Sequence, residues 1–386
     1  MKLRTVLCVT AVFLIGLPLH AAFTASAAEG FLINDGDSAP MIFAMSLQEP
    51  QRHNELLEVD LSVSGWSVGD TVRYEYRWNR STLGAVHSTD ADDPVVSFAP
   101  TVPNTRHVLQ VRAVDDAGIR SRWYQAADMI TPPPPRVIVA GDSIASGYTR
   151  QWFTSAGSCR DDAYAYGATA THELALGLPS AWAPTYRNVA WAGAGVHSMW
   201  NGGTDGCDVT HPSQVDEIKA AADPSTWNIV VITAGINSTN WSNVVADLTK
   251  NTAFSFSELG DKKACQKAVS ETWDLSSRTD SIASATKLIT ETLAAQTNAD
   301  LYWTSYFTIS GSHLAPGWTP IGAECDDEME MAMSLLDSTL QSGLADPVTW
   351  IDIDRGVLPL QDWGGWPHPN KEGQAMIGRT VAAAIR

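Results

Sequence analysis

Three polar side chains that can cooperate in nucleophilic catalysis lie next to apolar or amphipathic runs in the second part of the chain. Ser143 comes after the run 136–140 and Asn237 after the run 227–233, while His368 precedes a C-terminal amphipathic stretch. A neutral serine is a poor nucleophile and needs a base, such as a histidine, within hydrogen-bond reach. An amide can donate a hydrogen bond to the negative oxygen that then develops. The three residues together predict serine-based catalysis.

Each of these residues also has an ordinary structural interpretation. A serine in a strand-to-helix turn is most often a helix N-cap, an asparagine is common in turns, and a histidine before a helix can cap or pack. The small residues 192–195 let a backbone approach a ligand, but they also allow close helix packing. The functional interpretation therefore depends on all the positions occurring together.

The elements expected to position these residues alternate between strand and helix. Apolar runs predict buried strands, and longer stretches between several of them are compatible with helices; the strands are 136–140, 188–192, 227–233, 300–304 and 348–352, and the helices include 281–297 and 324–340. This alternation predicts an α/β fold, a three-layer α/β/α sandwich around a parallel sheet. Ligand sites of such sheets gather at the carboxyl ends of the strands.

Four short blocks at these expected strand ends resemble the signature blocks of the SGNH (GDSL-type) hydrolase family. Cys159-Arg160 and the expected number of disulfides resemble its secreted actinobacterial-type esterase and lipase branch. The four blocks are Gly141-Asp142-Ser143, Gly193, Gly235-Ile236-Asn237 and His368, and the resemblance covers residues 136–386. It implies that Ser143 is the nucleophile and His368 its base. It also implies an oxyanion hole made of the Ser143 and Gly193 backbone N–H groups and the Asn237 amide. The implied reaction is hydrolysis of a carboxylic ester through an acyl-enzyme, with no metal and no cofactor.

Two positions depart from the family pattern. Ser238 stands where the family commonly has Asp after G-x-N, and Gly365 stands where the family has the acid three residues before its His. Asp362 is the nearest acid and is the candidate to orient His368. The alternative is a Ser-His dyad, since the family includes members that orient the His with a main-chain carbonyl.

The residues before the catalytic region predict a separate all-β module. Apolar and polar residues alternate along 57–63 and 72–78, which predicts half-buried strands of a small β-sandwich over residues 28–130. The stretch 109–118 resembles the late strand and turn of fibronectin-III or Ig-like modules. A proline-rich linker, 131–135, follows, and consecutive prolines form a stiff spacer between domains. The expected catalytic domain, 136–386, comes after this linker.

A second serine motif lies inside this module. Residues 65–69 spell G-x-S-x-G around Ser67, the pattern of the nucleophile elbow of α/β-hydrolases. That elbow needs a strand before it and a helix after it, whereas here an alternating strand follows. We therefore interpret Ser67 as part of a loop.

The N-terminus predicts export. Lys2 and Arg4 precede the apolar run 6–19, and Ala25-Ser26-Ala27 is a small-residue cleavage site, so residues 1–27 are expected to be a signal peptide. Four cysteines remain after its removal, namely Cys159, Cys207, Cys265 and Cys325. An even count in an oxidising compartment favours two disulfides, and four cysteines allow three pairings. The sequential pairing closes the shorter loops and is the one we expect; a zinc site is disfavoured because no C-x-x-C occurs.

Composition excludes several partners. The 386 residues hold 25 Lys+Arg against 43 Asp+Glu, a formal net charge of −18 at pH 7. Nucleic acid is disfavoured because phosphate backbones are bound by clustered Lys and Arg. No apolar run in the interior of the chain is long enough to cross a bilayer. We expect a soluble, extracellular monomer without a transmembrane segment.

The substrate is the least specified part of the prediction. An acyl ester or lipid is expected first, and removal of acetyl groups from a polysaccharide second. Tryptophans in or near the signature blocks can line an acyl pocket or stack on sugar rings, although core packing accounts for most of them; they are Trp191, Trp200, Trp241, Trp363 and Trp366. A catalytically silent secreted binding protein is the alternative from another class, and the filled catalytic positions disfavour it.

Overall fold

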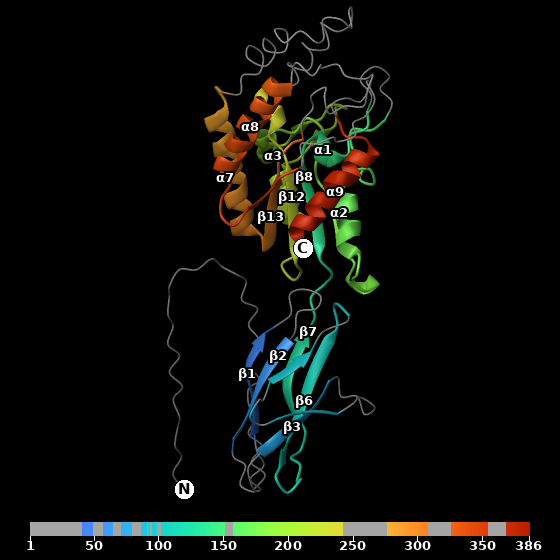
Figure 1. Cartoon of the computed structure of the whole chain (residues 1–386), viewed down its shortest axis with the longest axis vertical. Coiled ribbons are helices and arrows are strands. Elements are labelled where there is room, and N and C mark those ends of the chain that lie inside the picture. The colour runs from blue at the N-terminus through green and yellow to red at the C-terminus, as the bar shows by residue number, and fades with distance from the viewer. Residues whose placement is uncertain are drawn as a thin grey trace, which may run out of the picture.

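The structure is a computed structural model that describes residues 41–48, 57–64, 71–78, 86–90, 92, 95–98, 102–150, 157–241, 276–307, 326–353 and 368–386. Figure 1 shows antiparallel strands at one end of the molecule and a helix-covered parallel sheet at the other. The signal peptide predicted for residues 1–27 lies outside the described residues. Among the described helices, none is long and apolar enough to cross a membrane.

A five-stranded parallel sheet organises residues 136–386. Its strand order is β14-β13-β12-β8-β9. The strands are β8 (Arg136–Gly141), β9 (Thr185–Asn188), β12 (Asn228–Thr233), β13 (Ala299–Thr304) and β14 (Thr349–Ile351). The central strands β8 and β12 are apolar and almost wholly buried, as expected for parallel strands covered on both faces.

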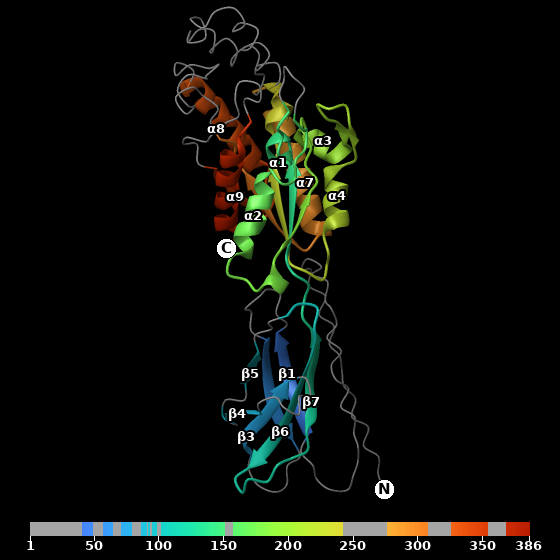
Figure 2. The ribbon, with the colours of Figure 1, turned by 90° about the vertical axis from the view of Figure 1, so that its right-hand side faces the viewer.

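Helices cover both faces of this sheet. Figure 2 shows α2 (Tyr166–Ala175) and α9 (Lys371–Ile385) on one side, and α3 (Val196–Asn201), α4 (Gln214–Ala221) and α7 (Thr279–Gln296) on the other. Helix α8 (Asp326–Ser342) packs against α7. The predicted three-layer α/β/α architecture with a parallel sheet is confirmed.

One predicted strand is displaced. The apolar run 188–192 was expected to be a strand, but β9 ends at Asn188. The Asn188 side chain accepts a hydrogen bond from the Ala190 N–H at 3.0 Å, which interrupts regular pairing. The chain still follows β8, because the Val189 N–H donates to the Val139 C=O at 2.8 Å. The irregular segment then leads to the turn that holds Gly193.

The strands before residue 131 form two antiparallel sheets. One has the order β1-β2-β5 and the other β4-β3-β6-β7. Their bounds are β1 Met41–Gln48, β2 Leu57–Ser64, β3 Thr71–Trp78, β4 His87–Asp90, β5 Val95–Phe98, β6 Arg106–Asp115 and β7 Tyr124–Ile130. Leu61, Val96 and Leu109, from both sheets, share one buried apolar cluster. The G-x-S-x-G of residues 65–69 lies outside the described residues, between β2 and β3.

Hydrogen bonds anchor the partly exposed proline run to the parallel-sheet region. The Thr226 hydroxyl donates to the carbonyls of Pro133 and Pro134, at 3.1 and 2.7 Å. The Thr185 N–H donates to the Pro135 carbonyl at 2.8 Å. These bonds tie the prolines to the amino ends of β9 and β12, at the opposite end of the sheet from Ser143.

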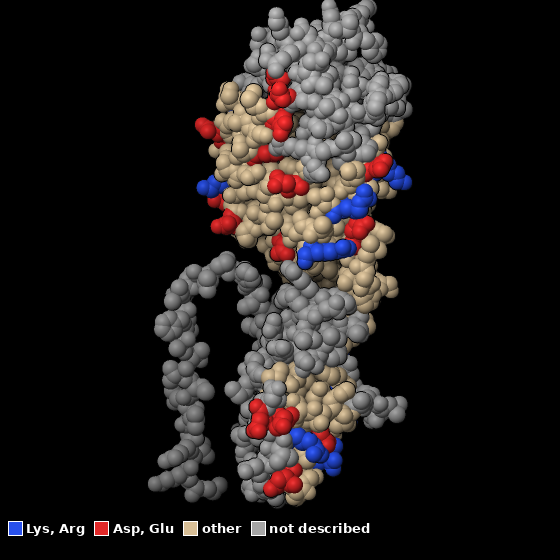
Figure 3. All heavy atoms as spheres, in the orientation of Figure 1, with Lys and Arg blue, Asp and Glu red and all other residues tan. Residues whose placement is uncertain are grey.

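Acidic side chains are spread over the surface (Figure 3), as the excess of Asp and Glu in the composition leads one to expect. The face of the molecule in Figure 3 carries Asp and Glu side chains over both ends, with Lys and Arg side chains interspersed among them.

Candidate active site

The turn that carries Ser143 can be built only with glycine at its start. Gly141 has a φ of 128°, and a Cβ there would lie 1.9 Å from the Thr233 carbonyl oxygen. Strands β8 and β12 can therefore approach closely at their carboxyl ends, where the chain turns into the short helix α1 (Ser143–Ser146). Asp142 caps this helix through its side chain, which accepts from the Ile144 N–H at 2.9 Å. Ser143 is thus the first residue of α1.

Asp142 connects the serine turn to the turn that follows β12. Its carboxylate is fully buried and accepts from the Tyr306 hydroxyl at 2.5 Å. The same hydroxyl accepts from the Ile236 N–H at 3.2 Å. The pKa of the Asp142 carboxyl is raised to about 7, because the effect of burial exceeds the opposing effect of the hydrogen bonds from Tyr306 and Ile144. Tyr306 was not singled out from the sequence.

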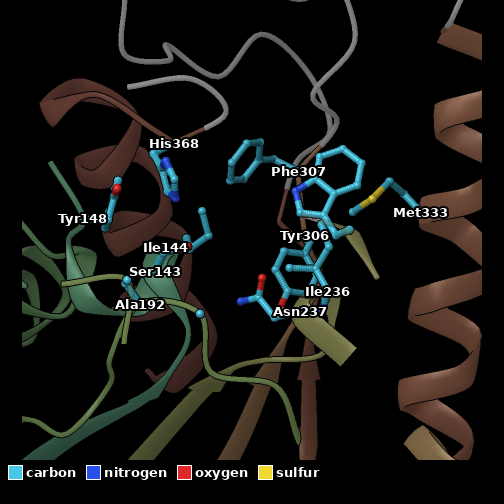
Figure 4. A pocket seen from close by; sticks show the side chains of 13 residues that line it. Ser143, Ile144, Tyr148, Ala192, Ile236, Asn237, Tyr306, Phe307, Met333 and His368 are labelled. Carbon is cyan, nitrogen blue, oxygen red and sulfur yellow. Dashed lines mark hydrogen bonds between the residues drawn. The ribbon is translucent and has the colours of Figure 1, made fainter. Parts of the chain in front are cut away.

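The expected oxyanion groups come from two neighbouring turns. Gly193 has a φ of 87°, and a Cβ there would meet nothing within 4 Å, so its backbone faces open space. Asn237 donates one amide N–H to the Ala194 carbonyl at 3.2 Å, which fixes the amide beside Gly193 and leaves a second N–H for a ligand. Figure 4 shows this amide directed toward the side of the pocket where Ser143 and Ala192 lie.

Ser238, which follows Asn237, links these two turns. Its hydroxyl accepts from the Val196 N–H at 2.9 Å, at the start of α3. A Cβ on Gly195 would lie 2.5 Å from that hydroxyl oxygen, so the approach requires glycine. Ser238 therefore holds the Gly193 and Asn237 turns against each other.

His368 lies on the opposite side of the pocket. It is 8% exposed and precedes α9, whose N-cap Asn370 accepts from the Gly373 N–H at 3.0 Å. The Tyr148 ring packs against its imidazole, with ring centroids 4.3 Å apart. In Figure 4 the imidazole lies above Ser143 and points into the pocket.

A single cavity of about 270 Å³ is lined by all four residues expected from the sequence, Ser143, Gly193, Asn237 and His368. The rest of its lining is mainly apolar or aromatic and includes Ile144, Ile236, Trp241, Tyr306, Phe307 and Met333. The serine hydroxyl, the imidazole and the amide therefore face one space that can take an apolar group. This arrangement can perform acyl transfer.

The tryptophans near the signature blocks have different surroundings. Trp241 lines the cavity, whereas Trp191 is buried and stacks on His211 at a centroid distance of 5.4 Å. Trp200 is partly exposed, at 36%. Trp363 and Trp366 lie outside the described residues.

Asp362, the candidate partner of His368, also lies outside the described residues. Replacing it by alanine is expected to lower kcat by less than about tenfold, roughly 1.4 kcal/mol, because we expect a backbone carbonyl of 364–366 to hold the imidazole. In a Ser-His-Asp triad the loss would be about 10⁴-fold. Steady-state kinetics on a variant with unchanged circular dichroism measures this. A loss of three decades or more would make Asp362 the third catalytic residue.

A disulfide shapes the rim of the cavity. Cys159 and Cys207 are bonded, as the sequential pairing predicted; Cys265 and Cys325 lie outside the described residues. Gly206, next to Cys207, lines the cavity, and its carbonyl accepts from Arg150 at 2.8 Å. The nearby Asp205 forms a compact cluster with both cysteines, but sulfurs joined in a disulfide cannot serve as thiolate ligands.

Converting Cys159 and Cys207 together to serine is expected to reduce the free energy of unfolding. The bridge spans 48 residues, for which the loop-entropy relation gives about 4 kcal/mol. Urea unfolding of the variant and the wild type measures the difference. A change below about 1 kcal/mol would show that this disulfide contributes little to stability.

Three buried amides around the serine turn were missed in the sequence. Gln214 both accepts from the Gly141 N–H (2.6 Å) and donates to its carbonyl (2.8 Å). Asn188 donates to the Ala145 carbonyl at 3.3 Å, and Gln374 to the Ile144 carbonyl at 3.1 Å. Gln374 had a detectable signal, since it is a polar residue on the apolar face of an amphipathic helix.

Comparisons with known proteins found relatives by structure only. No family model and no curated protein matches the sequence. A phospholipase A1 from Streptomyces albidoflavus is 18% identical, with 66% of this chain and 99% of that chain covered and a TM-score of 0.44. An extracellular lipase from Streptomyces rimosus is 14% identical, covering 65% and 99%, with a TM-score of 0.44. A family two carbohydrate esterase from Clostridium thermocellum is 14% identical, covering 90% and 89%, with a TM-score of 0.35. At these scores the similarity carries no conclusion about activity, which has to be inferred from the site.

Proposed function

We propose that this protein is a secreted serine esterase or lipase that hydrolyses carboxylic esters through an acyl-enzyme on Ser143. The observation that carries the proposal is the cavity lined together by Ser143, Gly193, Asn237 and His368. These residues are far apart in the sequence, and each alone has a structural explanation. Their convergence on one apolar cavity favours catalysis.

In the proposed mechanism, Ser143 Oγ attacks the ester carbonyl carbon while His368 takes the hydroxyl proton. The carbonyl oxygen becomes an oxyanion, which accepts hydrogen bonds from the Asn237 amide and from the Gly193 and Ser143 backbone N–H groups. Collapse of this intermediate breaks the C–O bond, and His368 gives its proton to the leaving alcohol. Water, deprotonated by His368, then attacks the acyl-enzyme, and release of the acid returns the proton to Ser143.

The cavity lining favours an acyl ester or lipid as substrate. Ile144, Ile236, Phe307 and Met333 surround the space beside Ser143, and apolar walls favour binding of a hydrocarbon chain over an acetyl group alone. The Cys159–Cys207 disulfide supports an oxidising compartment, as expected of an exported protein. We propose that residues 28–130 form an appended β-sandwich module, that 131–135 link it to the catalytic domain 136–386, and that the protein acts as a monomer.

A panel of p-nitrophenyl esters of increasing acyl length tests the proposed function. Hydrolysis that improves beyond the acetyl ester would support an acyl esterase or lipase. Activity on the acetate alone would favour a polysaccharide deacetylase of the same fold. Absence of turnover at every length would favour a secreted binding protein.

A further inference from the structure

We propose that Gln374 is a positioning residue that sets the placement of His368 relative to Ser143. The inference rests on the proposed function and adds to it a residue outside the cavity lining. Gln374 is 1% exposed, and its side chain makes two hydrogen bonds, both to backbone groups. Its Nε2 donates to the Ile144 carbonyl at 3.1 Å, and its Oε1 accepts from the Tyr166 N–H at 2.8 Å.

The first of these bonds joins the serine turn to the histidine segment. Ile144 directly follows Ser143, and Gln374 follows His368 by six residues. The two partners are 230 residues apart in the chain, so no local structure brings them together. The hydrogen bond therefore connects the nucleophile and its base through the protein rather than through the substrate.

The second bond fixes Gln374 to a rigid neighbour. Tyr166 begins α2, is fully buried, and shares a hydrogen bond of 2.8 Å between its hydroxyl and that of Thr233. Helix α9 lies close against α2, since a Cβ on Gly378 would meet the Tyr166 carbonyl oxygen at 2.6 Å. Gln374 is thus held from α2 and α1 at once.

The segment between Gln374 and His368 is short and constrained. The Gln374 N–H donates to the Asn370 carbonyl at 2.9 Å, which closes the first turn of α9. The Tyr164 hydroxyl donates to the Pro369 carbonyl at 3.3 Å. His368 and Gln374 are thus joined by a short, hydrogen-bonded segment, and we expect a displacement of Gln374 to shift His368.

The rate of proton transfer depends strongly on how accurately the imidazole is placed, so a residue that positions His368 should affect catalysis. Proton transfer from Ser143 needs the imidazole nitrogen within about 2.6–3.2 Å of the hydroxyl. A displacement of about 1 Å can cost about 10²-fold in rate. Loss of Gln374's hydrogen bonds should therefore slow catalysis without weakening substrate binding, because Gln374 does not line the cavity.

The test replaces Gln374 by methionine, which keeps the length of the side chain and removes both hydrogen bonds. The readouts are kcat and KM on the best ester of the panel, and the rate at which a fluorophosphonate labels Ser143. We expect kcat and the labelling rate to fall about 10- to 100-fold, with KM within twofold of wild type.

Asn228→Leu is the matched control. Asn228 is also a fully buried amide bonded to backbone, donating to the Asp223 and Thr226 carbonyls at 2.7 and 3.1 Å. It lies at the amino end of β12, away from the cavity. This variant should lose thermal stability at least as much as Gln374→Met and label within twofold of wild type. Equal slowing in both variants would show that general destabilisation is responsible and would overturn the inference.

A double-mutant cycle with His368→Ala separates positioning of the base from other effects. If Gln374 acts by placing His368, Gln374→Met should slow labelling in the wild type but add no further loss in His368→Ala. Losses that multiply would overturn the inference while leaving the esterase proposal intact. A wild-type protein that neither labels at Ser143 nor turns over an ester would overturn the esterase proposal, and this inference with it.

Discussion

Ser143→Ala is expected to lower kcat by about 10⁶-fold, which is the order of loss caused by removing a serine nucleophile, because His368 alone cannot replace it. The hydroxyl is the only part of Ser143 that this change removes. The α1 N-cap belongs to Asp142, whose side chain accepts from Ile144, so the helix should remain. Ester turnover, circular dichroism and thermal unfolding of the purified variant check both expectations.

Ser67→Ala is the control for this change. Ser67 belongs to the G-x-S-x-G that resembles a nucleophile elbow, but in the sequence it lies between β2 and β3, which belong to two different antiparallel sheets. We expect its replacement to leave turnover unchanged. If Ser67→Ala abolished turnover and Ser143→Ala did not, the assignment of the catalytic region to residues 136–386 would be wrong.

The sequence was sufficient for the architecture because parallel strands leave a strong signal. Between their end residues β8 and β12 are apolar, since both faces of the sheet are covered. The run 189–192 is also apolar, but regular pairing ends at Asn188, whose side chain accepts a hydrogen bond from the Ala190 N–H. That single hydrogen bond has no signal in the periodicity.

The residues that line the cavity could be expected from the sequence, whereas supporting residues other than Gln374 could not. Ser143, Asn237 and His368 each follow or precede a recognisable element, and strand ends converge at one edge of a sheet. Tyr306 and Gln214 act through contacts with Asp142 and Gly141 that join distant segments. Such contacts depend on the relative placement of elements, which residue types and spacing do not specify.

Asn237→Ala is expected to lower kcat by about 10²–10³-fold with little change in KM. The amide acts on charge that develops only after Ser143 attacks, so its loss should affect the transition state and not substrate binding. The geometry supports this role, because one amide N–H is occupied by the Ala194 carbonyl at 3.2 Å and the other is available beside Gly193. Steady-state kinetics on a short-chain p-nitrophenyl ester gives both constants.

Asn237→Asp distinguishes the proposed role from a purely structural one. The carboxylate has nearly the shape of the amide, but it cannot donate to Ala194 and places a negative charge beside the developing oxyanion. If Asn237 stabilises that oxyanion, the aspartate variant should be slower than the alanine variant, since Coulomb repulsion is added to the lost hydrogen bond. If Asn237 only held the turn at Gly193, the carboxylate would repel the Ala194 carbonyl, and any extra slowing of the aspartate variant would come with a lower thermal stability than that of the alanine variant. If it stabilises the oxyanion, the aspartate variant should be slower than the alanine variant even at equal thermal stability. A KM that rises while kcat stays constant would instead make Asn237 a substrate-binding residue.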